Sequence, residues 1–427
     1  MSFKPVQQLQ VRRTLSDGQE ALVGVLAQNR QGVFFQYDLP YLERYGNLSP
    51  LTLNGDHALQ QATPTPHGGL HGVFADALPD GWGLLLQDRV FRQQGILPAK
   101  ITPMDRLAFV GDRAMGALTF SPVSEYGAVV GGEISLASLG LEAQALFDGQ
   151  TDEVLAELVA AGSSGGARPK AQVYFSPGAS SQCRTQAGPG DEAWLVKFTS
   201  QNLALGHEEG LCEAAYLTLA EEAGLQPVEW QLLEAPKQSG ASHWLALKRF
   251  DRVQDSGGKV HMHSACGLLD ADFRTPRLDY ETLIKASRTL CQSPAAGQLQ
   301  FRRALFNLFA CNQDDHSKNW AFLQDDNKHW QLAPFYDVTF SPHPFGEHAT
   351  SFVGYGKKPP LKSIQHLARV ASFSNWTQAQ HAIQEMVDVI ASFSDIAKSL
   401  GVKVATVKLI KQQLDDAWQA NKHLLKK

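Results

Sequence analysis

Two short apolar runs separated by a polar break constrain this sequence more than any other feature. The runs cover residues 320–323 and 330–332, and the break at residues 325–328 reads D-D-N-K. Aromatic and aliphatic runs of this length, bounded by turn-forming residues, predict a β-hairpin. Because a hairpin brings its two ends together, we expect the polar side chains that flank it to meet in space.

The flanks of this hairpin carry groups that suit magnesium and phosphate. Asp314 and Asn319 precede the first run, and Asp337 follows the second. Mg²⁺ that is bound through substrate phosphates takes few protein ligands, all of them hard oxygens, and keeps several waters. The Asp-x-x-x-x-Asn spacing is also that of a protein-kinase catalytic loop, in which Asp accepts the hydroxyl proton and Asn holds the metal.

His316 and Lys318 lie between this Asp and this Asn. No H-x-x-x-H partner accompanies His316, which argues against a zinc ligand. We expect His316 to contact Asp314 or an ATP phosphate instead.

Composition limits the class of protein. The chain has 427 residues, 43% of them hydrophobic and 19% charged, with a formal net charge of −5, so no global basic excess favours a nucleic-acid coat. The five cysteines are scattered without a C-x-x-C pair, which argues against structural zinc and a disulfide framework. No apolar h-region or 18-residue apolar run is present, so we expect a cytoplasmic protein without a membrane partner.

Strand-like patterns dominate the first part of the sequence and helical patterns dominate after residue 278. This order predicts an α+β, two-lobed fold with a β-rich N-terminal region and a mainly α-helical C-terminal lobe. We place three domains at residues 1–125, 126–252 and 253–427.

A glycine- and serine-rich segment occupies residues 163–170, after an amphipathic helix predicted over residues 151–161. Such residues expose backbone N–H groups that suit phosphate oxygens, although no Walker A motif is present. The alternative is a flexible surface loop, but Lys170 stands at the start of a strand, where its charge reaches a phosphate. Residues 176–192 have turn composition and predict a mobile loop.

Lys197 stands within the apolar strand pattern W-L-V-K-F. A lysine on a buried strand needs an anionic partner, because burying an unpaired charge is costly. Glu213 on the following helix is a candidate, and Glu208, Glu209 and Glu221 compete with it. The alternative is a lysine on an exposed edge strand.

A further strand ends in Lys248, Arg249, Phe250, Asp251 and Arg252. Backbone groups at such an end would hydrogen-bond an adenine edge, and Asp251 would accept from a ribose hydroxyl. The alternative is a structural Arg–Asp ion pair.

Four motifs give the sequence a family resemblance: the G-G-A-R-P-K loop, the W-L-V-K-F strand, the R-F-D-R strand end, and D-D-H-S-K-N followed by P-F-Y-D. In this order they resemble the HipA-type serine/threonine kinases, the toxins of type II toxin–antitoxin modules. The runs F-A-D-A-L-P-D-G-W and R-L-A-F-V-G-D-R-A-M-G-A-L resemble the N-terminal subdomain of that family. The resemblance covers residues 20–395.

The resemblance implies a protein kinase that uses ATP and Mg²⁺, with Asp314 as the catalytic base and Asn319 and Asp337 as metal ligands. The residues implied to contact ATP are Gly165, Gly166, Ala167, Arg168, Pro169, Lys170, Lys197, Lys248, Arg249, Phe250, Asp251, His316, Lys318, Asn319, Tyr336 and Asp337. In this comparison Glu213 is the ion-pair partner of Lys197. Some members carry Gln-Glu where this chain has Arg168-Pro169, and the proline removes one N–H donor.

The family also implies regulation and partners. Its inhibitory autophosphorylation serine matches Ser163, with Ser164 as the alternative. Expected partners are a protein substrate such as an aminoacyl-tRNA synthetase or another translation component, and a HipB-like helix-turn-helix antitoxin through which the protein reaches DNA. The implied outcome is inhibition of growth or translation.

Residues 395–414 offer a different function, because their pattern is close to a helix-turn-helix. Lys398, Lys403, Lys408 and Lys411 would meet DNA phosphates in that case. The alternative protein is a catalytically weak, HipA-like DNA-binding co-repressor. An ordinary helical hairpin is favoured, because the segment lacks arginine and polar base-reading residues.

Overall fold

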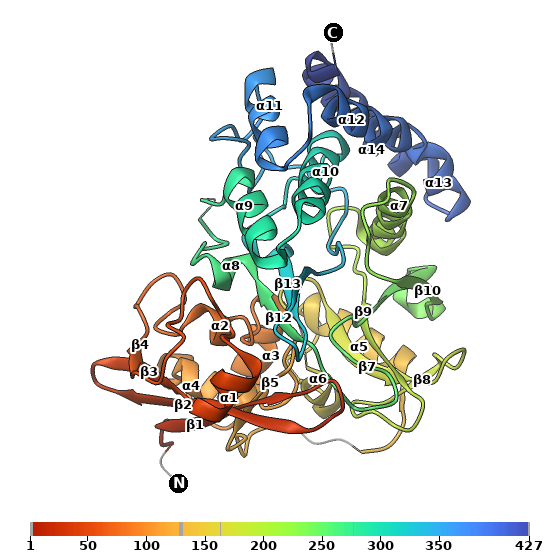
Figure 1. Cartoon of the computed structure of the whole chain (residues 1–427). Helices are drawn as coiled ribbons and strands as arrows, with labels where there is room; N and C mark the ends of the chain where they lie inside the picture. The colour runs from red at the N-terminus through yellow and green to blue at the C-terminus, as the bar shows by residue number, and fades with distance from the viewer. Residues whose placement is uncertain (1–2, 128–130, 163, 276, 426–427) are drawn as a thin grey trace. The chain divides into compact units, whose positions relative to one another are not determined.

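The chain forms two compact units in the computed structural model. The described residues are 3–127, 131–162, 164–275 and 277–425. The first unit comprises Met1–His207, Leu233–Asp270 and Leu323–Lys328, and the second comprises Glu208–Leu232, Ala271–Phe322 and His329–Lys427. Most strands belong to the first unit and the long helices to the second, which confirms the predicted α+β class (Figure 1). The division into three domains at residues 125 and 252 stays a prediction.

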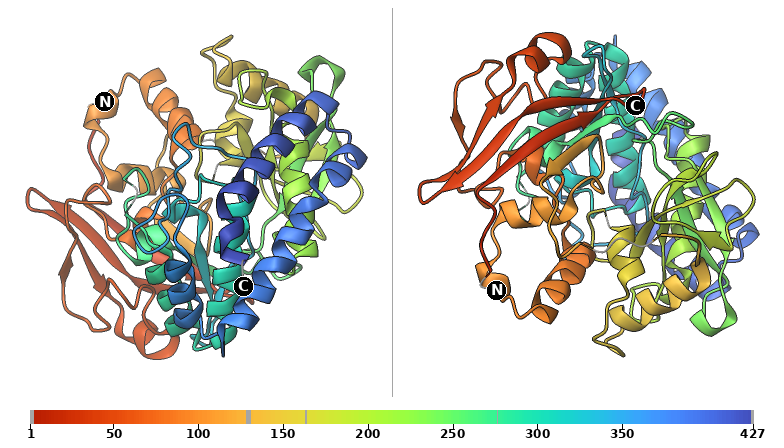
Figure 2. Two further views of the ribbon diagram at one scale, coloured as in Figure 1. Left: turned by 90° about the horizontal axis from the view of Figure 1, so that it is seen from above. Right: turned by 90° about the horizontal axis from the view of Figure 1, so that it is seen from below.

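An antiparallel five-stranded sheet forms the N-terminal part of the first unit, and its strands from the first forty residues appear in red in Figure 2. Its strands in spatial order are β4 (Gln60–Gln61), β3 (Gly32–Tyr37), β2 (Glu20–Asn29), β1 (Gln8–Thr14) and β5 (Leu118–Ser121). Along β3 the buried residues alternate with partly exposed ones. This period of two is what a sheet with one face on the core requires.

Three helices complete the core against this sheet: α1 (Leu39–Tyr45), α2 (Gly72–Ala75) and α4 (Pro103–Val110). Helix α3 (Gly81–Gln93), which η1 (Pro98–Lys100) follows, places Trp82 and Leu86 in a second core. Helix α4 begins where its sequence predicts, because Thr102 and Asp105 form a capping box and Pro103 occupies the first turn. Pro79 and Asp80 lie between α2 and α3, and the Asp80 carboxylate accepts a hydrogen bond from the glycine loop.

A second, four-stranded sheet carries the glycine loop at one end. Its order is β10 (Trp230–Glu234), β11 (His243–Lys248), β9 (Glu192–Lys197) and β7 (Lys170–Phe175). The other elements of the first unit are α5 (Leu136–Phe147), α6 (Ala156–Ala161), β6 (Ile134–Ser135), β8 (Gln182–Cys183), η3 (Lys237–Ser239), β12 (His261–Ser264) and α8 (Ala265–Leu268). Buried aromatic side chains such as Trp194 and Trp244 fill the core between the sheet and α5.

Two predictions beside this sheet are wrong. The helix expected over residues 151–161 begins only at Ala156, because Arg89 binds the Thr151 carbonyl and the Asp152 carboxylate of the preceding segment. Residues 176–192 were expected to form a mobile loop, but the strand β8 lies within them and pairs with β6, so they are not a loop throughout, and their mobility stays a prediction. The Arg184–Asp191 ion pair at 2.9 Å fixes the same segment.

Helix α10 is the centre of the second unit and packs against α9, α11, α12 and α14. It starts with Pro294 in the first turn and ends at Cys311, which adopts a left-handed conformation. The helical elements of this unit are η2 (Gly206–Glu208, at the boundary), α7 (Glu209–Glu222), α9 (Tyr280–Cys291), α10 (Pro294–Ala310), η4 (Ser317–Asn319), α11 (Leu361–Val370), α12 (Trp376–Ala391), α13 (Phe393–Ser399), α14 (Val404–Asn421) and η5 (Lys422–Leu425). In the described part of the chain, every helix is too short or too polar to cross a membrane.

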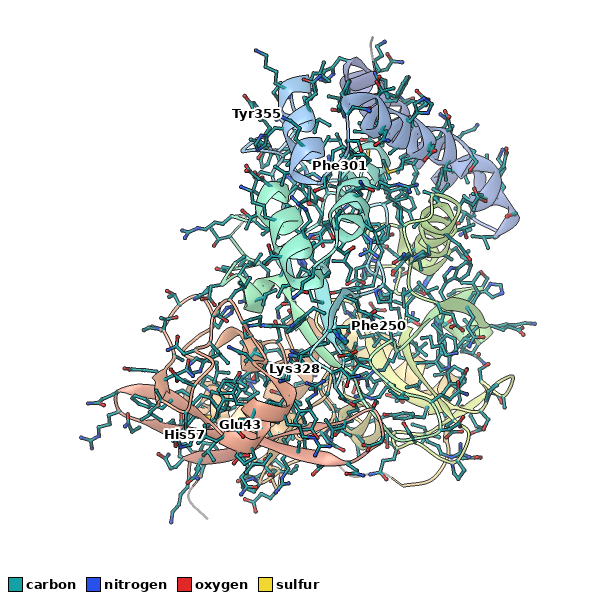
Figure 3. The ribbon with its side chains drawn as sticks, in the orientation of Figure 1. Glu43, His57, Phe250, Phe301, Lys328 and Tyr355 are labelled. Carbon is teal, nitrogen blue, oxygen red and sulfur yellow. The ribbon has the colours of Figure 1, made fainter. Side chains whose placement is uncertain are left out.

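The predicted hairpin is present as β13 (Ala321–Gln324) and β14 (Trp330–Leu332). Residues of the first unit hold its turn. The buried Arg13 guanidinium donates to the Gln324 and Asp325 carbonyls at 3.0 Å and pairs with Asp326 at 3.2 Å. Lys328 donates to the Glu43 carbonyl at 2.9 Å, and both residues are labelled in Figure 3.

Candidate active site

The glycine loop is pinned to the start of α3. The Gly166 N–H donates to the Asp80 carboxylate, and the Gly166 carbonyl accepts from the Trp82 N–H at 3.0 Å. The Trp82 indole also donates to the Lys170 carbonyl at 2.9 Å. These contacts argue against a free surface loop. Two residues of the P-D-G-W run, Asp80 and Trp82, make these contacts with the loop. The sequence had indicated only that this run resembles a family motif.

Lys170 and Lys197 are cross-strand partners in the second sheet. They face one another in the register of β7 and β9, and they are 3% and 6% exposed. The Lys170 ammonium donates to the Gly165 carbonyl at 2.5 Å. Strand β9 lies between β11 and β7, so the alternative of an exposed edge-strand lysine is wrong. Because like charges directly opposite each other repel, an anion beside the two ammonium groups, from the protein or from a ligand, would stabilise this pair.

The strand end after β11 contains a buried ion cluster. Both Asp251 oxygens accept from Arg249, at 3.0 and 2.7 Å, and Oδ2 also accepts from Arg252 and from the Gly116 N–H. Asp251 is fully buried, and the two guanidinium groups lower the pKa of its carboxyl although desolvation opposes them. The structural ion pair that the sequence offered as the alternative is thus present, and the expected ribose contact of Asp251 stays a prediction.

Lys248 and Phe250 flank this cluster differently. The Lys248 ammonium pairs with Glu192 at 2.7 Å and lies 5.8 Å from the centre of the Trp194 ring. Phe250, labelled in Figure 3, is partly exposed, unlike Arg249. Their role in holding adenine stays a prediction.

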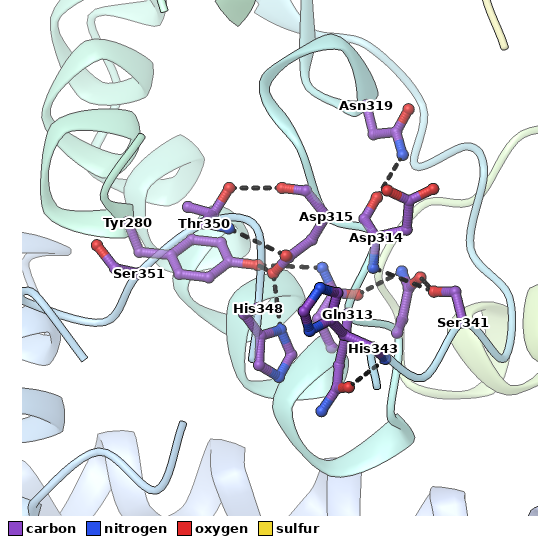
Figure 4. A network of polar contacts seen from close by, with 12 residues as sticks. Tyr280, Gln313, Asp314, Asp315, Asn319, Ser341, His343, His348, Thr350 and Ser351 are labelled. Atoms are coloured by element: carbon purple, nitrogen blue, oxygen red, sulfur yellow. Dashed lines mark hydrogen bonds and ion pairs between the residues drawn. The ribbon is translucent and has the colours of Figure 1, made fainter. Parts of the chain in front are cut away.

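In the second unit, Asp314 lies on a segment whose main chain is held at both sides. Its N–H donates to the Ser341 hydroxyl at 3.2 Å, and its carbonyl accepts from the Asn319 amide at 2.8 Å (Figure 4). The Asp314 side chain is 69% exposed, and its carboxylate lies 3.8 Å from the His316 ring nitrogen Nε2. The predicted contact between His316 and Asp314 is thus present at this distance.

The ends of the hairpin meet, while the meeting of Asp337 with Asp314 and Asn319 stays a prediction. The Tyr336 hydroxyl donates to the Lys318 carbonyl at 2.7 Å, and the Trp320 and Phe335 rings stack at 5.7 Å. Asp337 follows Tyr336 with a positive φ of 52°, which is uncommon for a residue other than glycine and marks functional sites. The Lys318 ammonium lies 4.5 Å from the centre of the Phe273 ring.

The donors at these ends fit Mg²⁺ in their chemistry. Asp314 and Asp337 offer carboxylate oxygens, and Asn319 offers an amide oxygen while its nitrogen serves the Asp314 carbonyl. Among the described residues, no group of three or more His, Cys, Asp or Glu side chains forms a preassembled metal site. A Mg²⁺ ion that is held mainly by phosphates and water does not need one.

The predicted partners of Lys197 lie on or beside α7. Glu213 is 1% exposed, and its pairing with Lys197 stays a prediction. Glu208 has another role, because its carboxylate accepts from the Lys403 N–H and the Thr406 hydroxyl, each at 2.6 Å. The Glu208 carboxylate thereby accepts an N–H group at the N-terminus of α14 and places a negative charge there, which stabilises the helix.

The segment proposed to read DNA is a helical hairpin in the second unit. Helices α13 and α14 pack together through buried residues such as Ala397 and Val407. Lys398 pairs with Asp395 at 3.8 Å, and Lys411 pairs with Asp415. The Glu208 contacts and these ion pairs favour the ordinary hairpin.

Of the two candidate phosphorylation sites, Ser163 lies outside the described residues, and Ser164 is partly buried beside Gly165.

Comparison with known proteins shows the family of this chain. The HipA N-terminal domain matches residues 18–121, and the HipA-like C-terminal domain matches residues 162–394. Putative kinase Y4mE of Sinorhizobium fredii is 29% identical over 137 residues, which are 30% of this chain and 31% of that relative. A putative kinase of Haemophilus influenzae is 28% identical over 143 residues, 31% of this chain and 41% of the relative. The matched regions span less than half of either curated relative.

A solved structure of Shewanella oneidensis MR-1 HipA, in complex with HipB and its operator DNA, has the same fold. The two chains superpose with a TM-score of 0.69 over 98% of each, at 15% sequence identity. The fold thus extends across both units, while the C-terminal domain match alone spans more than half of the 427 residues. This chain therefore belongs to the HipA family.

Proposed function

We propose that this protein is an ATP- and Mg²⁺-dependent serine/threonine protein kinase. The observation that carries the proposal is the closure of the hairpin ends, where Asp314 and Asn319 share a hydrogen bond at 2.8 Å and Tyr336 binds Lys318 beside Asp337. These residues match the positions that take the hydroxyl proton and hold the metal in phosphoryl-transfer enzymes. The buried pair Lys170 and Lys197 supports a polyphosphate ligand.

Each group then has a role in the transfer. Asp314 orients the acceptor hydroxyl and takes its proton, while Lys197, Lys170 and the backbone N–H groups of the glycine loop neutralise charge on the phosphates. Asn319 and Asp337 would hold Mg²⁺, which would supply further neutralisation of the phosphate charge when bound. Lys248, Arg249 and Phe250 hold the adenine.

The proposed regulation by phosphorylation and the proposed protein partners are those that membership of the HipA family suggests. Phosphate on Ser163, or on Ser164, would keep the glycine loop from closing over ATP, because it adds about two negative charges beside the loop. A HipB-like antitoxin is the proposed protein partner and the route to DNA. The proposed biological role is a cytoplasmic toxin that phosphorylates a translation component, with an aminoacyl-tRNA synthetase as one candidate.

A transfer assay tests this function directly. Incubation with ATP labelled at the γ-phosphate should label the protein itself or an added bacterial protein extract, and a chelator should prevent the labelling. Peptide mass spectrometry should then place the self-phosphate on Ser163. Labelling that persists in excess chelator contradicts the Mg²⁺ requirement, and phosphate found only on Ser164 or elsewhere contradicts the serine assignment.

Gly81→Ala is expected to weaken ATP binding about tenfold, which equals about 1.4 kcal/mol. Gly81 has a φ of +43°, and an added Cβ would lie 2.6 Å from the Gly166 carbonyl oxygen, so the glycine loop must shift. Gly95→Ala is the matched control, because Gly95 also has a positive φ, of +73°, with nothing within 4 Å of an added Cβ. Both variants share the backbone strain, but only the first displaces the loop.

Isothermal titration with a non-hydrolysable ATP analogue measures both dissociation constants. Equal affinities for the two variants would contradict a role of the loop in ATP binding.

A further inference from the structure

Asp315, the neighbour of Asp314, is a buried carboxylate that the proposed chemistry does not use. Its side chain is 0% exposed, whereas that of Asp314 is 69% exposed. We propose that Asp315 is a positioning residue, which fixes the segment bearing Asp314 and Asn319 through bonds to the interior of the second unit. This inference rests on the proposed kinase function and assigns a further residue to that site.

The Asp315 carboxylate is bound by three donors (Figure 4). Oδ2 accepts from the Tyr280 hydroxyl and lies 2.9 Å from Nδ1 of His348, while Oδ1 accepts from the Thr350 N–H at 3.1 Å. A carboxylate only accepts hydrogen bonds, so Nδ1 of His348 carries the hydrogen in this contact. The donors come from positions 35 residues before and 33 and 35 residues after Asp315, and they draw separate segments together on one group.

The main chain of Asp315 is held as firmly as its side chain. Its carbonyl accepts from the Trp320 indole at 3.0 Å and from the Thr350 hydroxyl. The Tyr280 hydroxyl also accepts from the Asn307 amide at 3.1 Å, which ties the first residue of α9 to α10. Asp315 is therefore fixed in place by both helices and by the chain around Thr350.

This fixation passes to Asp314 through the shared peptide bond, which is planar and stiff. The Asp314 side chain is 69% exposed, and its main chain is held on both sides by the bonds to Ser341 and Asn319. The Asp314 carbonyl in turn accepts from Asn319, so the two functional groups move together with this segment. A displacement of about 1 Å at a reacting group costs about a hundredfold in rate.

The structure offers a closely matched pair of variants. Tyr280→Phe removes one hydroxyl donor from Asp315, and Tyr216→Phe removes the donor to the Ala310 carbonyl at 2.7 Å. Both tyrosines are 0% exposed, and both belong to the second unit. The two substitutions therefore each remove one hydroxyl from a fully buried tyrosine, and only the first touches Asp315.

Tyr280→Phe should lower kcat at least tenfold and leave the KM for ATP within threefold of wild type, because the phosphate-binding groups are unchanged. Tyr216→Phe should leave kcat within twofold, with a similar shift in Tm. Hydrogen–deuterium exchange should become faster in peptides covering residues 313–319 of Tyr280→Phe only. Thr350→Ser, which keeps both bonds to Asp315, should retain wild-type kcat, and Thr350→Val should lose part of it.

These measurements separate the inference from the kinase proposal. If wild-type protein transfers no phosphate, the proposed function fails, while the exchange rates still test whether Asp315 fixes this segment. Equal exchange of residues 313–319 in the Tyr280 and Tyr216 variants, or an unchanged kcat in Tyr280→Phe, overturns the positioning role.

Discussion

Asp314→Ala should abolish phosphoryl transfer, with a loss of at least about a thousandfold in kcat/KM and no loss of stability. General-base catalysis by a positioned carboxylate contributes about 10² to 10⁴ in rate, and this residue would also orient the acceptor hydroxyl. Its side chain is 69% exposed, so the substitution removes little buried surface, and surface substitutions usually change stability by less than about 0.5 kcal/mol. The KM for ATP should stay close to wild type.

Radiolabelled phosphate transfer from ATP to a protein acceptor measures the loss. The matched control is Asp395→Ala, which removes a carboxylate with a 91% exposed side chain from the same unit and should retain full activity. Thermal unfolding of both variants should match wild type. Retained transfer in the Asp314 variant would remove this residue from the catalytic role, and equal losses in both variants would show a nonspecific effect.

A comparison of the phosphoproteomes of cells that express wild-type protein and Asp314→Ala then identifies the acceptor. Sites that depend on Asp314 are the candidate substrates, because both proteins fold and bind partners alike. This separates direct phosphorylation from the general response of a cell to growth arrest.

The parts of the site that sequence predicted are those with a local pattern. The hairpin at residues 320–332 was predictable because apolar runs and turn residues alternate along one short segment. The burial of Lys197 followed from its apolar neighbours in one strand. Each of these features is set by residues that are adjacent in sequence, where periodicity and turn chemistry are informative.

The parts that sequence missed depend on partners far along the chain. Nothing near Asp315 indicates that Tyr280 and His348 donate to it, and nothing near Gly166 indicates that Asp80 accepts its N–H. The helix expected from residue 151 was too long for the same reason, since Arg89 binds the segment before Ala156. Tertiary contacts of this kind override local propensity.

Asp251→Ala should destabilise the protein by about 3–5 kcal/mol, because removing one member of a buried ion cluster leaves uncompensated charge. Arg249 and Arg252 both donate to this carboxylate, and without it their two positive charges would remain side by side. Arg249 is only 5% exposed, so water would screen its charge little. The lost Gly116 contact adds to the cost. Denaturation by urea, followed by circular dichroism, measures the change in the free energy of unfolding.

The matched control is Glu20→Ala, which removes a carboxylate from the exposed Arg12–Glu20 pair in the same unit. Surface pairs of this kind contribute about 0–1 kcal/mol, so the control should stay near wild type. The pKa of Asp251 is depressed in the folded state, so its contribution is present above the ordinary aspartate range and is lost as the pH falls through the folded value.

The same variant decides between the two roles of Asp251 that the sequence left open. If its carboxylate bound a ribose hydroxyl, Asp251→Ala would raise the dissociation constant for ATP and leave the free energy of unfolding nearly unchanged. If it holds two buried guanidinium groups together, the stability falls first, and ATP binding suffers only as folded protein is lost. Correcting the titration of ATP for the folded fraction separates these outcomes. An affinity that is unchanged per folded molecule assigns Asp251 to the ion cluster.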